Sequence, residues 1–257
     1  MKHEQRITVP VLGVPIDVLD WDTVLERIRS WAEARESRYI CICNSHSVVT
    51  ATKDDAFGRI VEGADMATAD GAPVAGMIRR FGHAGQQRIN GPDLMFKYCA
   101  VAAKRGESIY LYGGAPETLE LLQIRLKAFF PGLLIAGAHS PPFRTATQDE
   151  DTADTARINA SGAGTVWVSL GCPKQEQWMA AHKNRIHAVM IGVGAAFDYH
   201  AGTLKRAPLW MQRAGFEWLH RLACEPRRLW RRYLVTNTLF VCGAVWQLTF
   251  KRHGNRT

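Results

Sequence analysis

The sequence predicts an α/β fold, a Rossmann-like and mostly parallel sheet covered by helices on both faces, followed by a C-terminal helical appendage. Short apolar segments alternate with segments of helical periodicity through residues 1–204, which is the pattern of strands joined by crossover helices. Several apolar segments run directly into polar loops that contain glycine, as strands do at the ligand-binding edge of such a sheet. The composition becomes basic and aromatic over residues 205–257, which predicts the appendage. A chain of 257 residues with 47% hydrophobic content can bury a full core.

The first elements expected are a strand with a turn within Val11–Leu19 and then a helix. Asp20 or Asp22 should cap that helix, because the apolar residues that follow recur at helical spacing. These residues are Val24, Leu25, Ile28 and Trp31. The triplet Asp20-Trp21-Asp22 also resembles the DxD metal clasp of many nucleotide-sugar enzymes. Aspartates are ordinary residues at a helix start, so we favour the capping interpretation.

Two predicted strands end in polar residues. Tyr39–Cys43 runs into Asn44, after which a helix should begin, and Asp65–Ala69 stops at Asp70 and a glycine. Because the carboxyl ends of parallel strands meet at one edge of a sheet, we expect Asn44 and Asp70 at the same rim. A helix cap or a turn residue is the alternative for each of them.

The middle of the chain is expected to hold a helix near Pro73–Arg80, a loop that contains Arg88, and a helix entered at Pro92. Ser108–Tyr112 is predicted as a strand that ends in a pair of glycines. The helix opened by Pro116 should bury an apolar stripe, and the N–H groups at its start suit a phosphate. The glycines are Gly113 and Gly114, and the stripe is Leu119, Leu122, Leu126 and Phe129.

The last part of the body repeats this pattern. A strand at Leu133–Ala136 and a helix at Thr147–Ala160 precede two strands, Val166–Leu170 and Ala188–Val193, with Pro173 in the first turn of the helix between them. Polar and glycine residues follow both of these strands, so we expect them to share one rim. They are Gly171, Lys174, Gln175, Glu176, Gly194, Asp198 and Arg206.

The appendage carries most of the positive charge. Residues 205–257 hold eleven Lys or Arg and two Glu, whereas residues 1–204 hold 21 basic and 22 acidic side chains. Tyr233–Phe250 has no formally charged side chain, and Lys251 and Arg252 follow it. The length is at the lower limit of a membrane span, and its polar residues favour an interfacial helix on anionic lipid. A helix buried on the body or in a homo-oligomer interface is the alternative.

Several other classes of protein fit the sequence poorly. The six cysteines show no CxxC pair and no histidine at zinc spacing, which indicates reduced thiols in a cytoplasmic protein. The N-terminus lacks the apolar run of a signal peptide, and no P-loop occurs. A nucleotide-sugar epimerase or dehydrogenase would share the architecture, but Gly192-Val193-Gly194 lacks the third glycine of a dinucleotide-binding motif. A nucleic-acid-binding protein would explain the basic, tryptophan-rich tail, although the long uncharged helix favours lipid over nucleic acid.

Several phrases, taken together and in order, resemble one family across about Val11–Phe240. The chain is similar to the bacterial WecG/TagA/CpsF glycosyltransferases, glycosyltransferase family 26. The matching phrases are Ala69-Asp70-Gly71, Arg88 through Gly91-Pro92-Asp93-Leu94, Leu170-Gly171-Cys172-Pro173-Lys174-Gln175-Glu176, Gly192-Val193-Gly194 through Phe197-Asp198, and Arg206-Ala207-Pro208 through Glu217-Trp218, Arg221-Leu222, Glu225-Pro226 and Arg228.

The resemblance implies an inverting enzyme that needs no metal or other cofactor and works on the cytoplasmic face of the bacterial inner membrane. It would transfer a sugar, of the N-acetylmannosamine type or a related hexose, from a UDP-sugar to a polyprenyl-diphosphate-linked saccharide. The family's proposed base corresponds to Asp70, and its neighbouring asparagine corresponds to Asn44. Some members carry a threonine two residues before that asparagine, where this chain has Ile42.

An inverting transfer also needs positive charge for the departing diphosphate. Arginines and helix N-termini are the expected sources, with Arg88, Arg221, Arg228 and Arg231 as the candidates. Solvated surface charge is the commoner role of a single arginine. By analogy, Gln175, Glu176 and Asp198 are expected to contact the donor sugar and the ribose, with a helix cap and a loop salt bridge as the alternatives.

Overall fold

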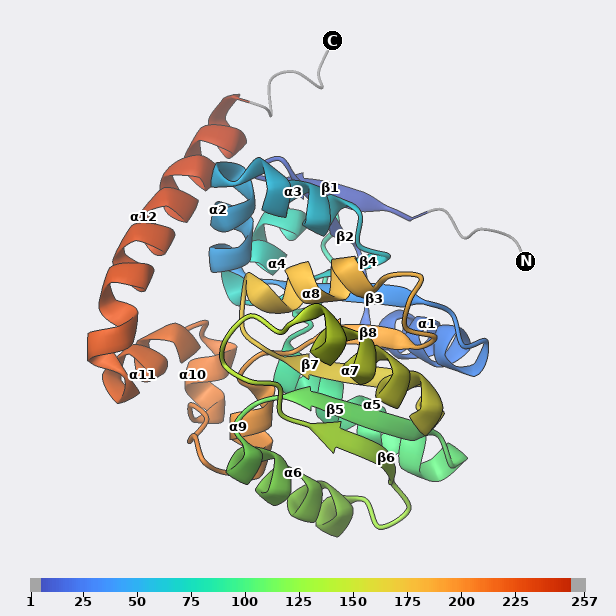
Figure 1. The fold of residues 1–257 in the computed structure, drawn as a ribbon. Helices are drawn as coiled ribbons and strands as arrows, with labels where there is room; N and C mark the ends of the chain where they lie inside the picture. The colour runs from blue at the N-terminus through green and yellow to red at the C-terminus, as the bar shows by residue number, and fades with distance from the viewer. Residues whose placement is uncertain (1–5, 251–257) are drawn as a thin grey trace.

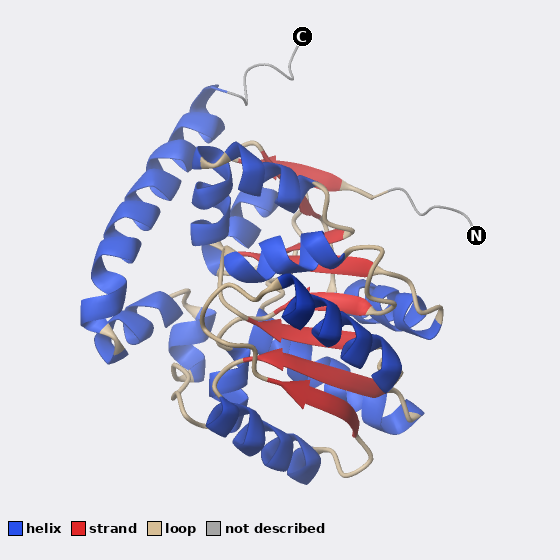
Figure 2. Cartoon of the chain, in the orientation of Figure 1, coloured by secondary structure: helices blue, strands red, loops and turns tan. Residues whose placement is uncertain are grey.

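A computed structural model describes residues 6–250 as a parallel six-stranded sheet among helices, as predicted (Figures 1 and 2). The strand order is β4-β3-β8-β7-β5-β6, and every neighbouring pair is parallel. The carboxyl ends of all six strands therefore meet at one edge. The strands are β3 (Arg38–Cys43), β4 (Met66–Ala69), β5 (Ser108–Gly113), β6 (Leu134–His139), β7 (Thr165–Ser169) and β8 (Val189–Gly192).

Helices cover both faces of the sheet because the strands are apolar on both sides. In β3, Tyr39, Cys41 and Cys43 face one core, and Ile40 and Ile42 face the other. The first core is covered by α2 (Ser45–Lys53), α3 (Asp55–Glu62), α7 (Gln148–Ser161) and α8 (Lys174–His182). The second is covered by α1 (Trp21–Glu33), α5 (Gly91–Arg105), α6 (Pro116–Phe129) and α9 (Ala196–Ala201).

The N-terminal segment forms a hairpin rather than a single strand with a turn. β1 (Thr8–Val11) and β2 (Val14–Asp17) pair in an antiparallel sheet of their own, and Leu12 and Gly13 make the turn with positive φ angles. Two positive φ angles in a two-residue loop match the right-handed twist of the strands. The hairpin packs on α4 (Ala72–Arg80) and on the edge strand β4.

A local sequence signal sets the start of α1. Asp20 caps α1 by accepting a hydrogen bond from the Thr23 amide (2.8 Å), so the capping interpretation is confirmed. Leu119, Leu122 and Leu126 of α6 are buried as expected, but Phe129 is 56% exposed. It is the last residue of α6, and its ring packs on the ring of Phe96.

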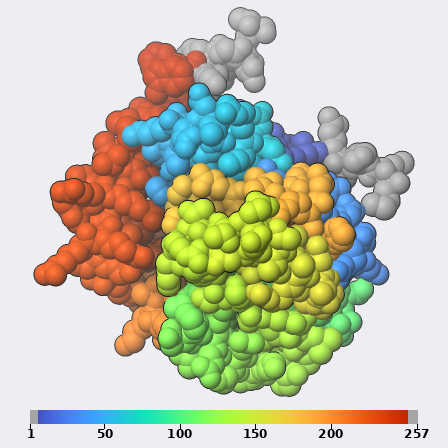
Figure 3. Space-filling view, viewed as in Figure 1, coloured from blue at the N-terminus to red at the C-terminus, as the bar shows by residue number. Residues whose placement is uncertain are grey.

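The C-terminal segment runs along the edge where the strands end. It consists of α10 (Leu209–Arg213), α11 (Glu217–Cys224) and α12 (Pro226–Phe250), and α12 begins at Pro226. The strand arrowheads in Figure 1 point toward these helices, and Figure 3 shows the segment forming one side of the molecule. Lys251 and Arg252 lie outside the described residues.

The helix α12 packs on the body along one side only. Thr236, Phe240 and Gln247 are buried, whereas Leu234 and Trp246 are exposed by about 60%. By length and composition it is the one described helix apolar enough to cross a membrane. The helix therefore combines a face docked on α2 with an apolar face that no described residue covers.

Gln247 fastens the end of α12 to the hairpin. Its side-chain oxygen accepts a hydrogen bond from the Leu12 amide (2.7 Å), and its nitrogen donates to the Pro10 carbonyl. Both bonds join the side chain to backbone groups of the β1–β2 hairpin. A buried side chain of this kind holds two elements distant in sequence together.

We expect Gln247→Ala to release the end of α12 from the hairpin, at a cost of about 1–3 kcal/mol in the free energy of unfolding. Hydrogen exchange measured at the Leu12 amide should accelerate. The exposed Thr238→Ala, on the same helix, is the control and should leave the exchange rate unchanged. Equal protection of Leu12 in wild type and Gln247→Ala would show that these bonds do not hold the helix.

Candidate active site

A cavity of about 1140 Å³ lies at the carboxyl edge of the sheet. Its floor comes from residues that directly follow strands, among them Asn44 after β3, Asp70 after β4 and Val193 after β8. Its other wall comes from α11 and α12. The parallel sheet thus opens into a cleft that the C-terminal segment covers.

Asp70 lies in this cleft next to an arginine from the following loop. Its amide continues the sheet by donating to the Cys43 carbonyl (2.9 Å), and its carboxylate lies 3.5 Å from the Arg88 guanidinium. Burial raises the pKa of Asp70 above its ordinary value; Arg88 opposes this shift and the nearby carboxylate of Glu217 adds to it. A carboxylate with a raised pKa in a cleft is suited to accept a proton.

A chain of alternating charges joins the cleft to the appendage. Arg88 donates to Glu217 of α11, and Glu217 also accepts from the Arg206 Nε (3.4 Å). Arg206 in turn donates to Asp93 of α5 (Nη2 to Oδ2, 3.1 Å). We call Asp70, Arg88, Glu217, Arg206 and Asp93 the ion chain. Arg206 does not line the cleft, contrary to the sequence prediction, and its guanidinium is held by Glu217 and Asp93.

Three arginines of α11 and α12 line the covering wall. The Arg221 guanidinium lies 6.0 Å from the Tyr199 ring, and Arg228 pairs with Glu225 (2.6 Å). Arg232 lies in the same wall, and its buried Nε has no hydrogen-bond partner among residues 6–250. Burial lowers the pKa of Arg232, and Arg221 and Arg228 also lower it. Positive charge is therefore concentrated on this side of the cleft.

Arg231 was predicted here but lies elsewhere. Its guanidinium sits 5.1 Å from the Trp230 ring on the exposed side of α12, and it does not line the cleft. Arg231 and Arg232 both follow Pro226 in α12, and Arg231 stands one position off the helix face that lines the cleft. Within α12 the four-residue step from Arg228 to Arg232 marks one helix face, and that signal identifies the residue that the sequence prediction missed.

Helices that begin at the cleft leave backbone N–H groups uncapped. Neither α4, which follows Gly71, nor α6, which follows Ala115, has a capping side chain, and both cap residues line the cleft. Gly114 lines it too, whereas Gly113 does not. At Gly113, with φ +106°, a Cβ would come within 2.4 Å of the Ser169 carbonyl oxygen, so this glycine allows β5 and β7 to approach.

The other predicted residues differ in whether they line the cleft. Gly171, Gly194 and Asp198 line the cleft, and burial raises the pKa of Asp198. Lys174 is exposed on the first turn of α8 and does not line it.

Gln175 and Glu176 line the cleft, and both residues are buried. The Gln175 oxygen accepts from the Gly171 amide (3.2 Å), and its nitrogen donates to Glu176 Oε1 (2.9 Å). Glu176 Oε2 has no partner among the described residues, and burial raises the pKa of this carboxyl.

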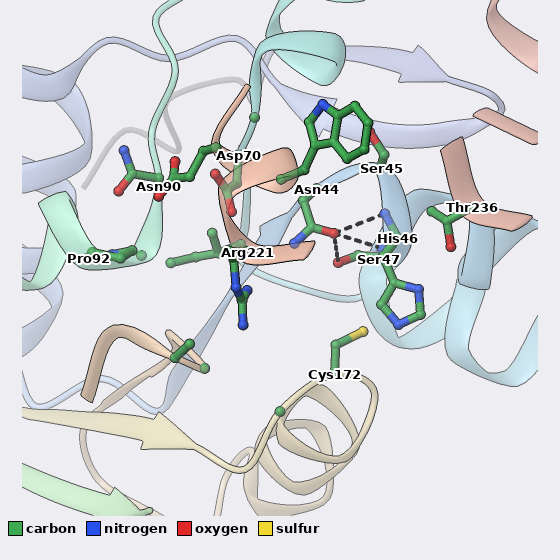
Figure 4. Close-up of a pocket in the computed structure, with 18 of the residues that line it drawn as sticks. Asn44, Ser45, His46, Ser47, Asp70, Asn90, Pro92, Cys172, Arg221 and Thr236 are labelled. Carbon is green, nitrogen blue, oxygen red and sulfur yellow. Dashed lines mark hydrogen bonds between the residues drawn. The ribbon is translucent and has the colours of Figure 1, made fainter. Parts of the chain in front are cut away.

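Asn44 caps α2 and also faces the cleft. Its oxygen accepts from the amides of His46 (2.9 Å) and Ser47 (3.2 Å), and Figure 4 shows its nitrogen pointing away from α2 into the space shared with Asp70 and Arg221. The cap and the ligand-facing position are thus compatible. Burial lowers the pKa of His46 to about 4, with Arg232 contributing, so this ring is neutral near pH 7.

The aspartate triplet takes no part in the cleft. Asp20 caps α1, and neither Asp20 nor Asp22 is among the lining residues. Within residues 6–250, no three acidic, histidine or cysteine side chains converge as metal ligands do. The cleft offers a buried carboxylate, guanidinium groups and helix N-termini instead.

The family comparison covers the residues that form this cleft. A model described as the glycosyl transferase WecG/TagA/CpsF family matches residues 9–254. The match includes every residue of the ion chain and both walls of the cleft. This chain belongs to the WecG/TagA/CpsF family of glycosyltransferases.

Proposed function

We propose that this glycosyltransferase moves a sugar from a UDP-sugar to a polyprenyl-diphosphate-linked saccharide in the synthesis of a cell-surface polysaccharide. The sugar is of the N-acetylmannosamine type or a related hexose, and the transfer proceeds with inversion and without a metal. One observation supports this most: the Asp70 carboxylate shares a cavity with Arg88, Arg221 and Arg228. The same observation favours glycosyl transfer over an epimerase, a dehydrogenase or a nucleic-acid-binding protein.

Asp70 is the proposed general base. It takes the proton from the acceptor hydroxyl while that oxygen attacks the anomeric carbon of the donor, and the bond to the UDP oxygen breaks on the opposite side. The proton ends on Asp70, whose burial already favours the neutral carboxyl. Asn44, whose nitrogen is free to donate, would orient the reacting sugar.

The departing diphosphate needs positive charge that is already in place. Arg221 and Arg228 supply guanidinium groups, and the uncapped starts of α4 and α6 supply N–H groups at the positive ends of two helices. In this proposal Gln175, Glu176 and Asp198 contact the donor sugar and the ribose. Lys174, Arg206, Arg231 and Gly113 lie outside the cleft and have no such part.

The appendage, residues 205–257, brings the enzyme to its lipid-linked acceptor. The exposed apolar side of α12 and its basic neighbours suit the headgroup region of an anionic membrane, here the cytoplasmic face of the inner membrane. Residues 1–204 then act as the catalytic body. The arginines reach the cleft from the same helices that meet the lipid.

We expect Asp70→Asn to retain UDP affinity and to lower the transfer rate by about 10²–10⁴-fold, because the amide cannot accept the proton. Product formation followed by mass spectrometry, with UDP binding by calorimetry, measures both quantities. Asp22→Asn is the matched control and should transfer normally, since Asp22 lies outside the cleft. Normal turnover of Asp70→Asn would remove Asp70 from the mechanism.

The neighbours of Asp70 predict opposite shifts in the pH profile of kcat/KM. Arg88 lowers the pKa of Asp70 and Glu217 raises it, and only the ionised carboxylate acts as base. The acidic limb should therefore move to higher pH in Arg88→Gln and to lower pH in Glu217→Gln. Lys174→Gln, outside the cleft, should not move it. Shifts of the same sign in the first two variants would contradict the assignment.

Membrane contact is predicted to depend on the exposed side of α12. Leu234→Glu combined with Trp246→Glu should reduce co-sedimentation with phosphatidylglycerol vesicles by about tenfold, since both side chains would leave the lipid. Leu121→Glu combined with Ile124→Glu places the same charges on α6 and should not reduce it. If the α12 variant sediments as wild type does, the appendage does not bind lipid through this face.

A further inference from the structure

The cavity extends past the charged residues into a groove between two helices. On one side it is lined by α4, including Gly76 and Met77, and on the other by α12. We call this part of the cavity the α4–α12 groove. Its lining on α12 is Phe240, Val241, Ala244, Val245 and Leu248.

The lining face of α12 changes in polarity along its length. It begins with Arg228 and Arg232, continues with Thr236 and Asn237, and ends in the apolar lining of the groove. Steps of three and four residues keep all of these on one face. At 1.5 Å per residue the apolar part spans about 12 Å. Among the described lining residues of α4, and of α12 beyond Arg232, Arg80 is the one charged side chain, and it is exposed.

Gly76 marks space in this groove that none of residues 6–250 fills. A glycine inside a helix is less stable than an alanine, so it usually serves a close approach. Gly243 of α12 follows that rule, since a Cβ there would come within 2.7 Å of the Leu12 side chain. A Cβ at Gly76 would meet nothing within 4 Å. The room beside Gly76 is therefore open to a ligand.

The groove is continuous with the cleft that the proposed function assigns to sugar transfer. A cavity of about 1140 Å³ exceeds the usual range for a single small ligand, so donor and acceptor can occupy it together. The apolar lining of the groove reaches the last turns of α12, where Val245, Trp246 and Phe250 are exposed. A ligand with a charged head and a hydrocarbon tail would match the arginines at one end of this lining and the apolar residues at the other.

We propose that the α4–α12 groove binds the isoprenoid chain of the acceptor next to its diphosphate. The diphosphate would then lie near Arg232 and Asn237, with the sugar directed toward Asp70. This inference rests on the proposed function for the identity of the acceptor. It assigns the enzyme a chain-recognition site separate from the binding of the sugar.

Calorimetry with farnesyl diphosphate and with inorganic diphosphate tests the groove directly. Wild type should bind farnesyl diphosphate at least tenfold more tightly than inorganic diphosphate. Gly76→Leu fills the groove and should abolish this preference while the affinity for inorganic diphosphate changes little. Gly85→Leu is the control, because a Cβ there also meets nothing within 4 Å but the residue lies outside the groove.

A second variant guards against misfolding of the first. Val245→Asp places a charge on the opposite, exposed wall and should also abolish the preference for farnesyl diphosphate. Retention of the wild-type preference in either folded variant would overturn the proposal. So would equal affinity of wild type for the two ligands.

Transfer assays separate this inference from the proposed function. With N-acetylglucosamine linked through diphosphate to either a farnesyl or a methyl group, Gly76→Leu should lose kcat/KM selectively for the farnesyl acceptor. If wild type transfers no sugar to either acceptor, the proposed function fails, and the calorimetric preference still decides the groove. An equal loss with both acceptors contradicts chain recognition by the groove.

Discussion

Glu217 is the residue on which the arrangement of the site depends. It is the first residue of α11, and it accepts hydrogen bonds from Arg88 beside Asp70 and from Arg206 beside Asp93. The charges of the ion chain alternate, so the removal of one member leaves a half-buried charge without its partner. The same carboxylate adds to the raised pKa of Asp70. One side chain thus positions the covering helices and tunes the carboxylate beneath them.

The cleft has two walls, one formed by the strand ends and the other by α11 and α12. The strand ends supply Asn44 and Asp70, and α11 and α12 supply the guanidinium groups opposite them. Along α12 the lining then passes from arginine through Thr236 and Asn237 to hydrocarbon, while the outer face stays apolar and exposed. A soluble, anionic donor needs positively charged side chains, and an amphipathic acceptor also needs an apolar surface. The lining face of α12 carries both.

The sequence predicted the features that depend only on neighbouring residues in the chain, such as where a strand ends or a helix begins. Asn44 and Asp70 could be placed at one rim because each directly follows a parallel strand, and Asp20 could be recognised as a cap from the helix after it. Features that depend on tertiary packing escaped prediction. Arg231 and Arg232 are adjacent in α12, and the packing of this helix directs Arg232 to the cleft. Arg206 points to Asp93 and Glu217 rather than the rim. Gly113 was assigned to phosphate, but the approach of β5 to β7 requires it.

The central claim is that Asp70 and the arginines of the appendage act on one donor and one acceptor in a single cleft. A crystal structure of the enzyme with UDP and a diphosphate-linked acceptor sugar tests this most directly. The claim predicts an acceptor hydroxyl within about 2.6–3.2 Å of the Asp70 carboxylate, with the UDP diphosphate held by Arg221 and Arg228. A diphosphate bound away from these arginines, or an acceptor with no hydroxyl near Asp70, would contradict it.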